Sequence, residues 1–150
     1  MLERRIEQDL KAALLSGDRT KVDTLRIIKS ALLYAKVEKG KRDSGLDEEE
    51  EIAVLSKEAK KRQESADLYI KGGNQSRAEA ELAEKVIIEA YLPQQLSENE
   101  LNSVVETVVD KLKAKDLSAM GQVIATVKAE TAGAADGANI ARLVKERLSS

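Results

Sequence analysis

Apolar residues recur along this chain at the spacing of α-helices, in steps of three and four positions. In the first segment Leu2, Ile6, Leu10, Ala13 and Leu14 fall on one helical face, because such steps return to the same side of a helix with 3.6 residues per turn. The same pattern continues through six further segments. We therefore predict seven helices, over residues 2–15, 20–39, 47–70, 74–92 and 97–112 and from residues 118 and 136 onward.

Capping and breaking residues mark the ends of these predicted helices. Asp47 with Glu50, and Ser97 with Glu100, have the spacing of capping boxes. Pro93 disfavours a helical conformation in the residue before it, and it separates four long helices from three shorter ones. We predict an all-α protein with an up-and-down four-helix bundle over residues 1–92 and a three-helix tail subdomain over residues 93–150.

Composition supports this fold class and narrows the function. Charged residues make up 35% of the 150 positions and aromatic residues only 2%, a balance that disfavours β-sheets. The chain has neither cysteine nor histidine. It therefore lacks the residues for disulfides, for zinc–thiolate sites and for the commonest general-base catalysis. We expect no metal, no cofactor and no self-sufficient catalytic site.

Charge and hydropathy indicate a protein of an aqueous compartment. The formal net charge is −2, which predicts solubility more than affinity for polyanions. Acidic residues interrupt the first segment, unlike a signal or transit peptide. No apolar run approaches the roughly 20 residues needed to span a bilayer. We expect a cytoplasmic protein with no membrane partner.

Two runs of like charge stand in segment 47–70. The acidic run 47–51 is interpreted as a helix N-terminus, where carboxylates oppose the positive end of the helix dipole. Its consecutive side chains point in different directions and do not converge on a metal ion. Lys57, Lys60 and Lys61 share one face of the same predicted helix. They indicate either a nucleic-acid contact or, more commonly, a solvated helix face.

Two further residues stand beside apolar positions. Arg26 flanks the apolar stripe of segment 20–39. Because a half-buried guanidinium needs a partner, we predict an ion pair with a bundle carboxylate such as Glu64, with phosphate binding as the alternative. Tyr91 lies at the boundary marked by Pro93. We expect its ring to pack between the subdomains and not to stack on a base.

A glycine-bracketed turn at residues 133–137 opens the last predicted helix. Helix N-termini bind anions, but Asp136 is itself a good N-cap and would use the free amides. A structural cap by Asp136, followed by Gly137, is therefore favoured over a phosphate site. The sequence contains no phosphate loop and no dinucleotide fingerprint.

Four motifs, in this order, resemble those of the YqeY-like family. They are Asp-Thr-Leu-Arg-Ile-Ile at 23–28, Lys-Lys-Arg-Gln-Glu-Ser at 60–65, Glu-Ala-Tyr-Leu-Pro-Gln-Gln-Leu-Ser at 89–97, and Met-Gly-Gln-Val at 120–123 followed by Ala-Asp-Gly at 135–137. Together they extend over nearly the whole chain. The resemblance implies two all-α subdomains, the first of them a left-handed four-helix bundle.

The family resembles the tail domain of the B subunit of the glutamine-dependent tRNA amidotransferase, where the tail helps to hold the tRNA and other domains carry the chemistry. The resemblance therefore implies a tRNA- or aminoacyl-tRNA-associated accessory module, at most accessory to such a carbon–nitrogen ligase. A protein-interaction adaptor without RNA contact is the alternative. For RNA, the expected contact is the solvent face of the last helix, with Arg142 and Lys145, extended by Lys128.

Overall fold

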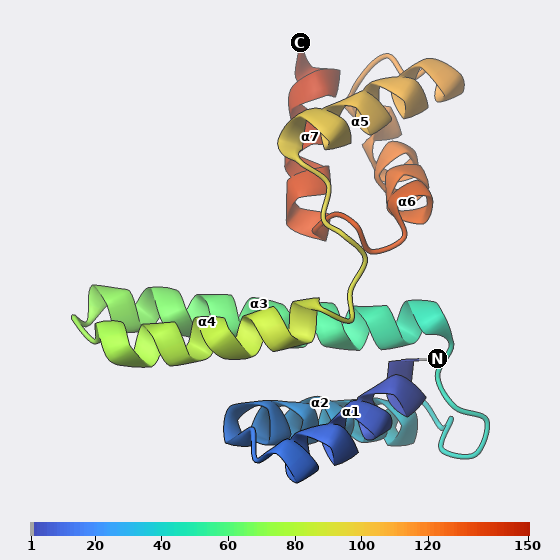
Figure 1. The fold of residues 1–150 in the computed structure, drawn as a ribbon. Helices are drawn as coiled ribbons and strands as arrows, with labels where there is room; N and C mark the ends of the chain where they lie inside the picture. The colour runs from blue at the N-terminus through green and yellow to red at the C-terminus, as the bar shows by residue number, and fades with distance from the viewer. Residues whose placement is uncertain (1) are drawn as a thin grey trace. The chain divides into compact units, whose positions relative to one another are not determined.

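The computed structural model describes residues 2–150 and contains in that range seven α-helices, one short 3₁₀ helix and no strand. The chain is therefore all-α, as its periodicity and composition predict (Figure 1). It divides into two compact units, Met1–Leu92 and Pro93–Ser150. Each unit has its own hydrophobic core.

The first unit consists of two helical hairpins. Helices α1 (Leu2–Ser16) and α2 (Arg19–Glu38) form one, and α3 (Glu48–Lys71) and α4 (Gln75–Glu89) form the other. Helix α2 contacts both helices of the second hairpin, and Figure 1 shows the hairpins as two layers. The core between them is apolar and includes Ile6, Leu25, Ile28, Leu32, Leu55 and Ile88.

The predicted helix ends are confirmed where a side chain caps them. The Asp47 side chain accepts from the Glu50 amide and the Glu50 side chain accepts from the Asp47 amide, which completes the capping box of α3. Ser97 and Glu100 do the same at the start of α5 (Glu98–Leu112). Helix α4 ends at Glu89, earlier than predicted, because the amides of Tyr91 and Leu92 bond to carbonyls only three residues back.

The second unit packs α5, α6 (Met120–Thr131) and α7 (Gly137–Ser149) around a core of branched aliphatic side chains. The apolar pattern predicts a sixth helix from Ser118 onward. Instead a 3₁₀ turn, η1 (Leu117–Ala119), precedes α6, and the Asp116 side chain accepts from the Ser118 amide at 2.9 Å. The fully buried core residues are Val105, Val108, Val123, Val127, Ile140 and Val144.

Tyr91 is buried in the core of the first unit. Its hydroxyl donates to Asp9 of α1, and the Arg5 guanidinium lies 4.8 Å from the ring centroid. Burial, and then the bond to Asp9, raises the pKa of the Tyr91 hydroxyl well above its ordinary value. The ring is thus held by α1 of its own unit, whereas its position beside Pro93 in the sequence predicts packing between the subdomains.

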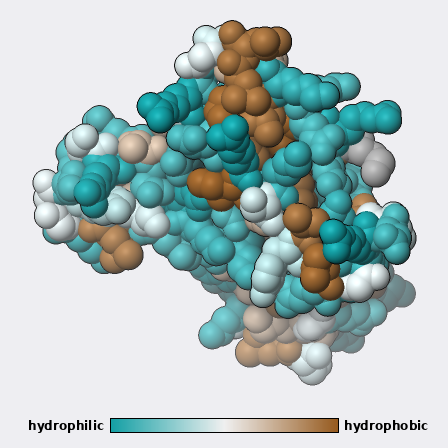
Figure 2. Space-filling model, turned by 90° about the horizontal axis from the view of Figure 1, so that it is seen from below, coloured by the Kyte–Doolittle hydropathy of each residue, from teal (hydrophilic) through white to brown (hydrophobic). Residues whose placement is uncertain are grey.

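Polar residues cover most of the molecular face drawn in Figure 2, with separate apolar groups among them. Four of the exposed large apolar side chains belong to α2: Ile27, Leu33, Tyr34 and Val37. Over residues 2–150, no helix combines the length and the apolar character that crossing a membrane requires.

Candidate functional site

Two of the motifs found in the sequence meet in the second unit. The Gln95 side chain donates to the carbonyl of Gly133 at 3.0 Å, and the backbone amide of Leu96 donates to the carbonyl of Ala134 at 2.8 Å. The segment that leads into α5 is therefore bonded to the loop that leads into α7. These bonds fix the position at which α7 begins.

The start of α7 is capped as predicted. The Asp136 side chain accepts from the backbone amide of Ala138 at 3.3 Å. Lys128 of α6 lies beside the same turn, and a Cβ added to Gly137 would lie 3.4 Å from the Lys128 Cε and 3.6 Å from its Nζ. The absence of a side chain at Gly137 leaves this space to the lysine. The structure thus brings Lys128 to the N-terminal end of α7.

Arg142 and Lys145 are exposed on α7, as the helical period predicts. The Arg142 guanidinium is bound by two carboxylates, those of Glu98 at 2.8 Å and Glu146 at 3.3 Å. These bonds, led by the one to Glu98, raise the pKa of Arg142. An external anion therefore has to compete with two internal ones for this guanidinium.

Arg147 also lies on α7 and pairs with Glu106 of α5 at 2.6 Å. No such ion pair is present for Lys145 or Lys128 among the residues that the structure describes. The second unit contains seven lysines and arginines against eight aspartates and glutamates. The face of α7 therefore offers a few accessible cations without a strongly positive surface.

The basic run of α3 separates into residues with different surroundings. Lys57 and Lys60 are exposed, whereas Lys61 pairs with Glu58 at 3.3 Å. Its neighbour Arg62 faces α4 and is largely buried. Two of the three predicted lysines, Lys57 and Lys60, therefore remain available on this face for an external ligand.

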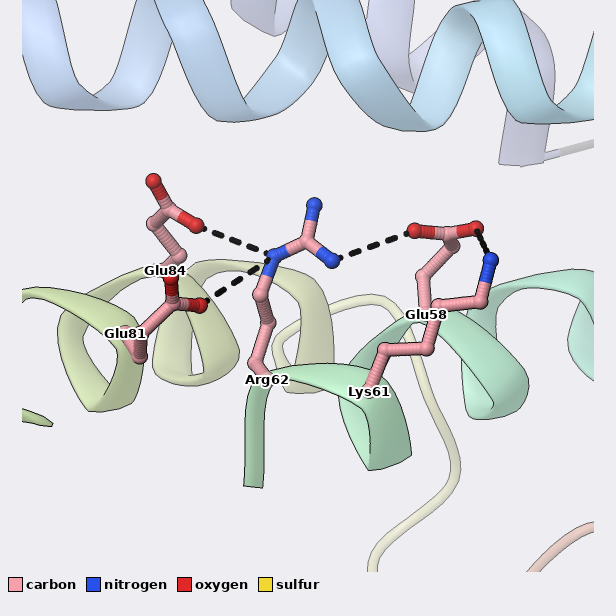
Figure 3. Close-up of polar contacts among 5 residues, drawn as sticks. All are labelled: Glu58, Lys61, Arg62, Glu81 and Glu84. Carbon is pink, nitrogen blue, oxygen red and sulfur yellow. Dashed lines mark hydrogen bonds and ion pairs between the residues drawn. The ribbon is translucent and has the colours of Figure 1, made fainter. Parts of the chain in front are cut away.

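Arg62 is the centre of an ion-pair network between α3 and α4 (Figure 3). Its Nε donates to Glu84 at 2.9 Å and lies 4.0 Å from a Glu81 oxygen. Its Nη1 donates to Glu58 at 3.3 Å. The guanidinium fork can bind carboxylates on both sides. This arrangement holds the two helices together and uses the Nε and Nη1 donors of the guanidinium for internal carboxylates.

The predicted pair between Arg26 and Glu64 is wrong. Both side chains are exposed, and within residues 2–150 no ion pair joins them. Arg26 instead lines a shallow hollow at the end of the first hairpin, beside Leu14 and Asp23. Arg26 therefore needs no buried partner, because its position on α2 faces solvent.

Residues 2–150 contain no group of three or more acidic side chains placed to hold a metal ion. The acidic run at the start of α3 shows why. Glu50 bonds to Lys41 and Lys39, whereas the buried Glu51 faces α1. Consecutive carboxylates point in different directions, as the sequence analysis predicts.

A comparison with family models decides the relationship of the chain. The model described as "Yqey-like protein" matches residues 3–148. The chain belongs to the Yqey-like family. The match runs through both units, and it includes all four motifs on which the resemblance was based.

One relative of this Yqey-like chain is "Altered inheritance of mitochondria protein 41, mitochondrial", from Eremothecium gossypii. The two are 32% identical over 87 residues, which is 58% of this chain and 46% of the relative. The chain thus covers about half the length of that relative. The word mitochondrial in that name describes the relative.

The sequence did not predict two contacts of the Yqey-like chain, those of Arg62 and of Gln95. In the sequence analysis Arg62 stands only within the motif at 60–65, and Gln95 only within the motif at 89–97. A helical wheel places Arg62 three and four positions from the buried Ala59 and Ala66, which is a signal for an inward-facing side chain. For Gln95 the sequence carries no such signal, because its partner lies in another loop.

Proposed function

We propose that this protein is an accessory module for tRNA or aminoacyl-tRNA, without catalytic chemistry of its own. In this proposal the first unit is an up-and-down four-helix bundle and the second is the three-helix tail that contacts RNA. Arg142 and Lys145 on α7 contact phosphates, and Lys128 extends the contact at the N-terminal end of that helix. The cytoplasm is the proposed compartment.

The observation that carries the proposal is the fixed start of α7. Gln95 and Leu96 bond to the loop before the helix, and Lys128 lies against Gly137. The family motifs thus position a helix whose outer face holds exposed cations. Phosphate contacts position a protein on nucleic acid without reading its sequence, which suits an accessory role.

The ion pairs of Arg142 set the expected strength of binding. A phosphate must displace Glu98 or Glu146, both of which lie within 3.3 Å of the guanidinium. We therefore expect weak affinity that falls steeply with salt, since each phosphate contact contributes roughly 0.7–0.9 to the slope of log K against log salt. The paired carboxylates therefore make this a low-affinity contact.

The experiment measures tRNA affinity at several salt concentrations. Replacing Arg142 and Lys145 together by alanine should reduce the salt slope by about one to two units. Arg147→Ala is the matched control, because Arg147 is an ion-paired arginine of the same helix that lies outside the proposed phosphate contact. Arg147→Ala should reduce the salt slope by less than about half of the reduction expected for the double variant.

A second pair of variants tests the competing carboxylates. Glu98→Gln with Glu146→Gln releases Arg142 and should raise tRNA affinity. Glu106→Gln with Glu130→Gln changes the net charge equally and leaves both Arg142 bonds intact, so it should raise the affinity less. An equal gain in the two double variants would argue against a contact at Arg142. Absence of tRNA binding by the wild type at low salt would refute the proposal.

A protein-interaction adaptor is the second candidate. It is favoured by the near balance of charges in the second unit and by the exposed apolar residues of α2. If the α7 variants do not change tRNA binding but binding persists, Lys57 and Lys60 are the next RNA contacts to test. If no RNA binds, the adaptor is preferred.

A further inference from the structure

Helix α2 has an outer face that nothing in the first unit covers. Its apolar side chains are unusually exposed: Tyr34 is 71% exposed, Val37 57%, Leu33 48% and Ile27 41%. The opposite face of the same helix is buried in the core. Figure 2 shows apolar groups on a surface that is otherwise mostly polar. Helix α2 therefore has two apolar faces. One is buried in the core of the first unit, and the other is exposed.

This outer face is arranged about a small residue, Ser30, which is itself exposed. Residues three and four positions away on either side share its face. Three positions away are two aliphatic residues, Ile27 and Leu33. Four positions away are Arg26 on one side and Tyr34 on the other. At three and four positions the face thus presents matching or complementary chemistry at equal distances from Ser30, whereas at seven positions Asp23 is the counterpart of Val37.

We infer that this face binds the same face of a second copy of the chain, with the two α2 helices antiparallel and Ser30 on the two-fold axis. In that register, a residue three positions after Ser30 in one copy meets the residue three positions before Ser30 in the other copy. The same holds at four positions. Ile27 then packs against Leu33, and the Arg26 guanidinium lies over the Tyr34 ring. Each contact occurs twice, as a two-fold interface requires.

Arg26 and Ser30 give this arrangement its specificity. No intramolecular ion pair holds Arg26 within the described range, so its guanidinium is available for a cation–π contact with the exposed Tyr34 ring. The small side chain at Ser30 allows two helix backbones to approach closely at the crossing point. Like charges do not meet in this register, because Arg26 faces an aromatic ring.

The size of the face predicts a weak dimer. One helix pair buries less than the roughly 1,200 Å² that marks the lower end of standard protein interfaces. We therefore expect a monomer in dilute solution and a dimer at high concentration. This inference is independent of tRNA binding, which is proposed for α7 in the second unit.

The test uses the natural absence of cysteine from the full chain. In Ser30→Cys, the two-fold axis brings the new thiols together, and a disulfide forms when the Cβ atoms lie about 3.5–4.5 Å apart. Mild oxidation should give a disulfide-linked dimer. Ser76→Cys is the matched control, since Ser76 is equally an exposed serine near the start of α4. It should crosslink at least roughly tenfold more slowly.

Further variants test the register. Adding Arg26→Glu or Leu33→Glu to Ser30→Cys should slow crosslinking roughly tenfold each. Both positions are exposed, so the melting temperature should stay nearly unchanged. Sedimentation of the wild type should show a mass that rises with concentration. Crosslinking of Ser30→Cys no faster than that of Ser76→Cys, when a small thiol reagent labels both cysteines equally fast in dilute solution, would overturn the inference.

Discussion

The carboxylate of Glu51, in α3, accepts a hydrogen bond from the backbone amide of Glu3, in the first turn of α1, at 3.1 Å. Glu51 is only 2% exposed. The first amides of a helix have no partner within the helix, and a carboxylate also opposes the positive end of its dipole. One helix of the first unit is thus capped by a side chain that is 48 residues away in sequence.

Removing this cap should destabilise the protein. Glu51→Ala leaves a part-buried amide without its acceptor, which costs about 1–3 kcal/mol. Glu51→Gln keeps an acceptor and should lose less. Glu49→Ala, an exposed change in the same turn, should stay within about 0.5 kcal/mol. Urea unfolding measures all three free energies, and a Glu51→Ala value equal to that of Glu49→Ala would contradict the cap.

The Arg62 network gives a second stability prediction. Arg62→Ala leaves the Glu58 carboxylate, with a side-chain exposure of 12%, with only the exposed Lys61 as a partner. Loss of one member of a largely buried ion pair costs about 3–5 kcal/mol. Lys61→Ala removes only an exposed partner of the same carboxylate and should cost about 0–1 kcal/mol. Thermal and denaturant unfolding compare the two, and similar losses would show that the network is not what joins α3 to α4.

Two buried threonines should respond in opposite directions to the same substitution. The Thr24 hydroxyl is buried and has no hydrogen-bond partner within residues 2–150, whereas Thr131 donates to the carbonyl of Val127 at 2.9 Å. Thr24→Val removes an unsatisfied polar atom and should stabilise the protein by about 1 kcal/mol. Thr131→Val breaks a bond and should destabilise it by a similar amount. Equal signs in the two unfolding experiments would refute this reading.

The Glu50 carboxylate should make stability depend on pH. The bond from Lys41, and then those from the Asp47 amide and from Lys39, lower the pKa of Glu50 from 4.5 to about 2. Because the folded pKa is the lower one, this stabilisation is present above pH 4.5 and is lost as the pH falls towards 2.

Glu50→Gln should therefore flatten the acid limb of the stability curve between these two pH values. Glu48→Gln, an exposed change in the same helix turn, should leave that limb as it is. A titration of the Glu50 side chain by NMR with a midpoint near 4.5 would contradict the prediction.

The sequence predicted the features that depend on neighbouring residues. Asp47 and Glu50 lie three positions apart, and so do Ser97 and Glu100, so their capping boxes could be recognised from spacing alone. The cap at Asp136 was equally local. In each case the partner is fixed by the geometry of one helix turn.

Contacts between helices could not be predicted in this way. Glu51 belongs to a run of similar carboxylates, and only packing against α1 determines which of them becomes buried. The expected partner of Arg26 was wrong because the edge of an apolar stripe does not show which side another helix covers. The bond from Gln95 to Gly133 joins two loops, for which hydrophobic periodicity gives no register.

The bond between Gln95 and Gly133 also has a consequence for the order in which the protein can be made. Its two residues are 38 positions apart, which at ribosomal rates is a delay of about two to eight seconds. Until Gly133 emerges, the segment before α5 has no anchor, and the apolar side of α5, with Leu101, Val105 and Val108, has no cover from α7. During that interval the newly made chain exposes the apolar face of α5 to its surroundings. The residues of the first unit have by then already been synthesised.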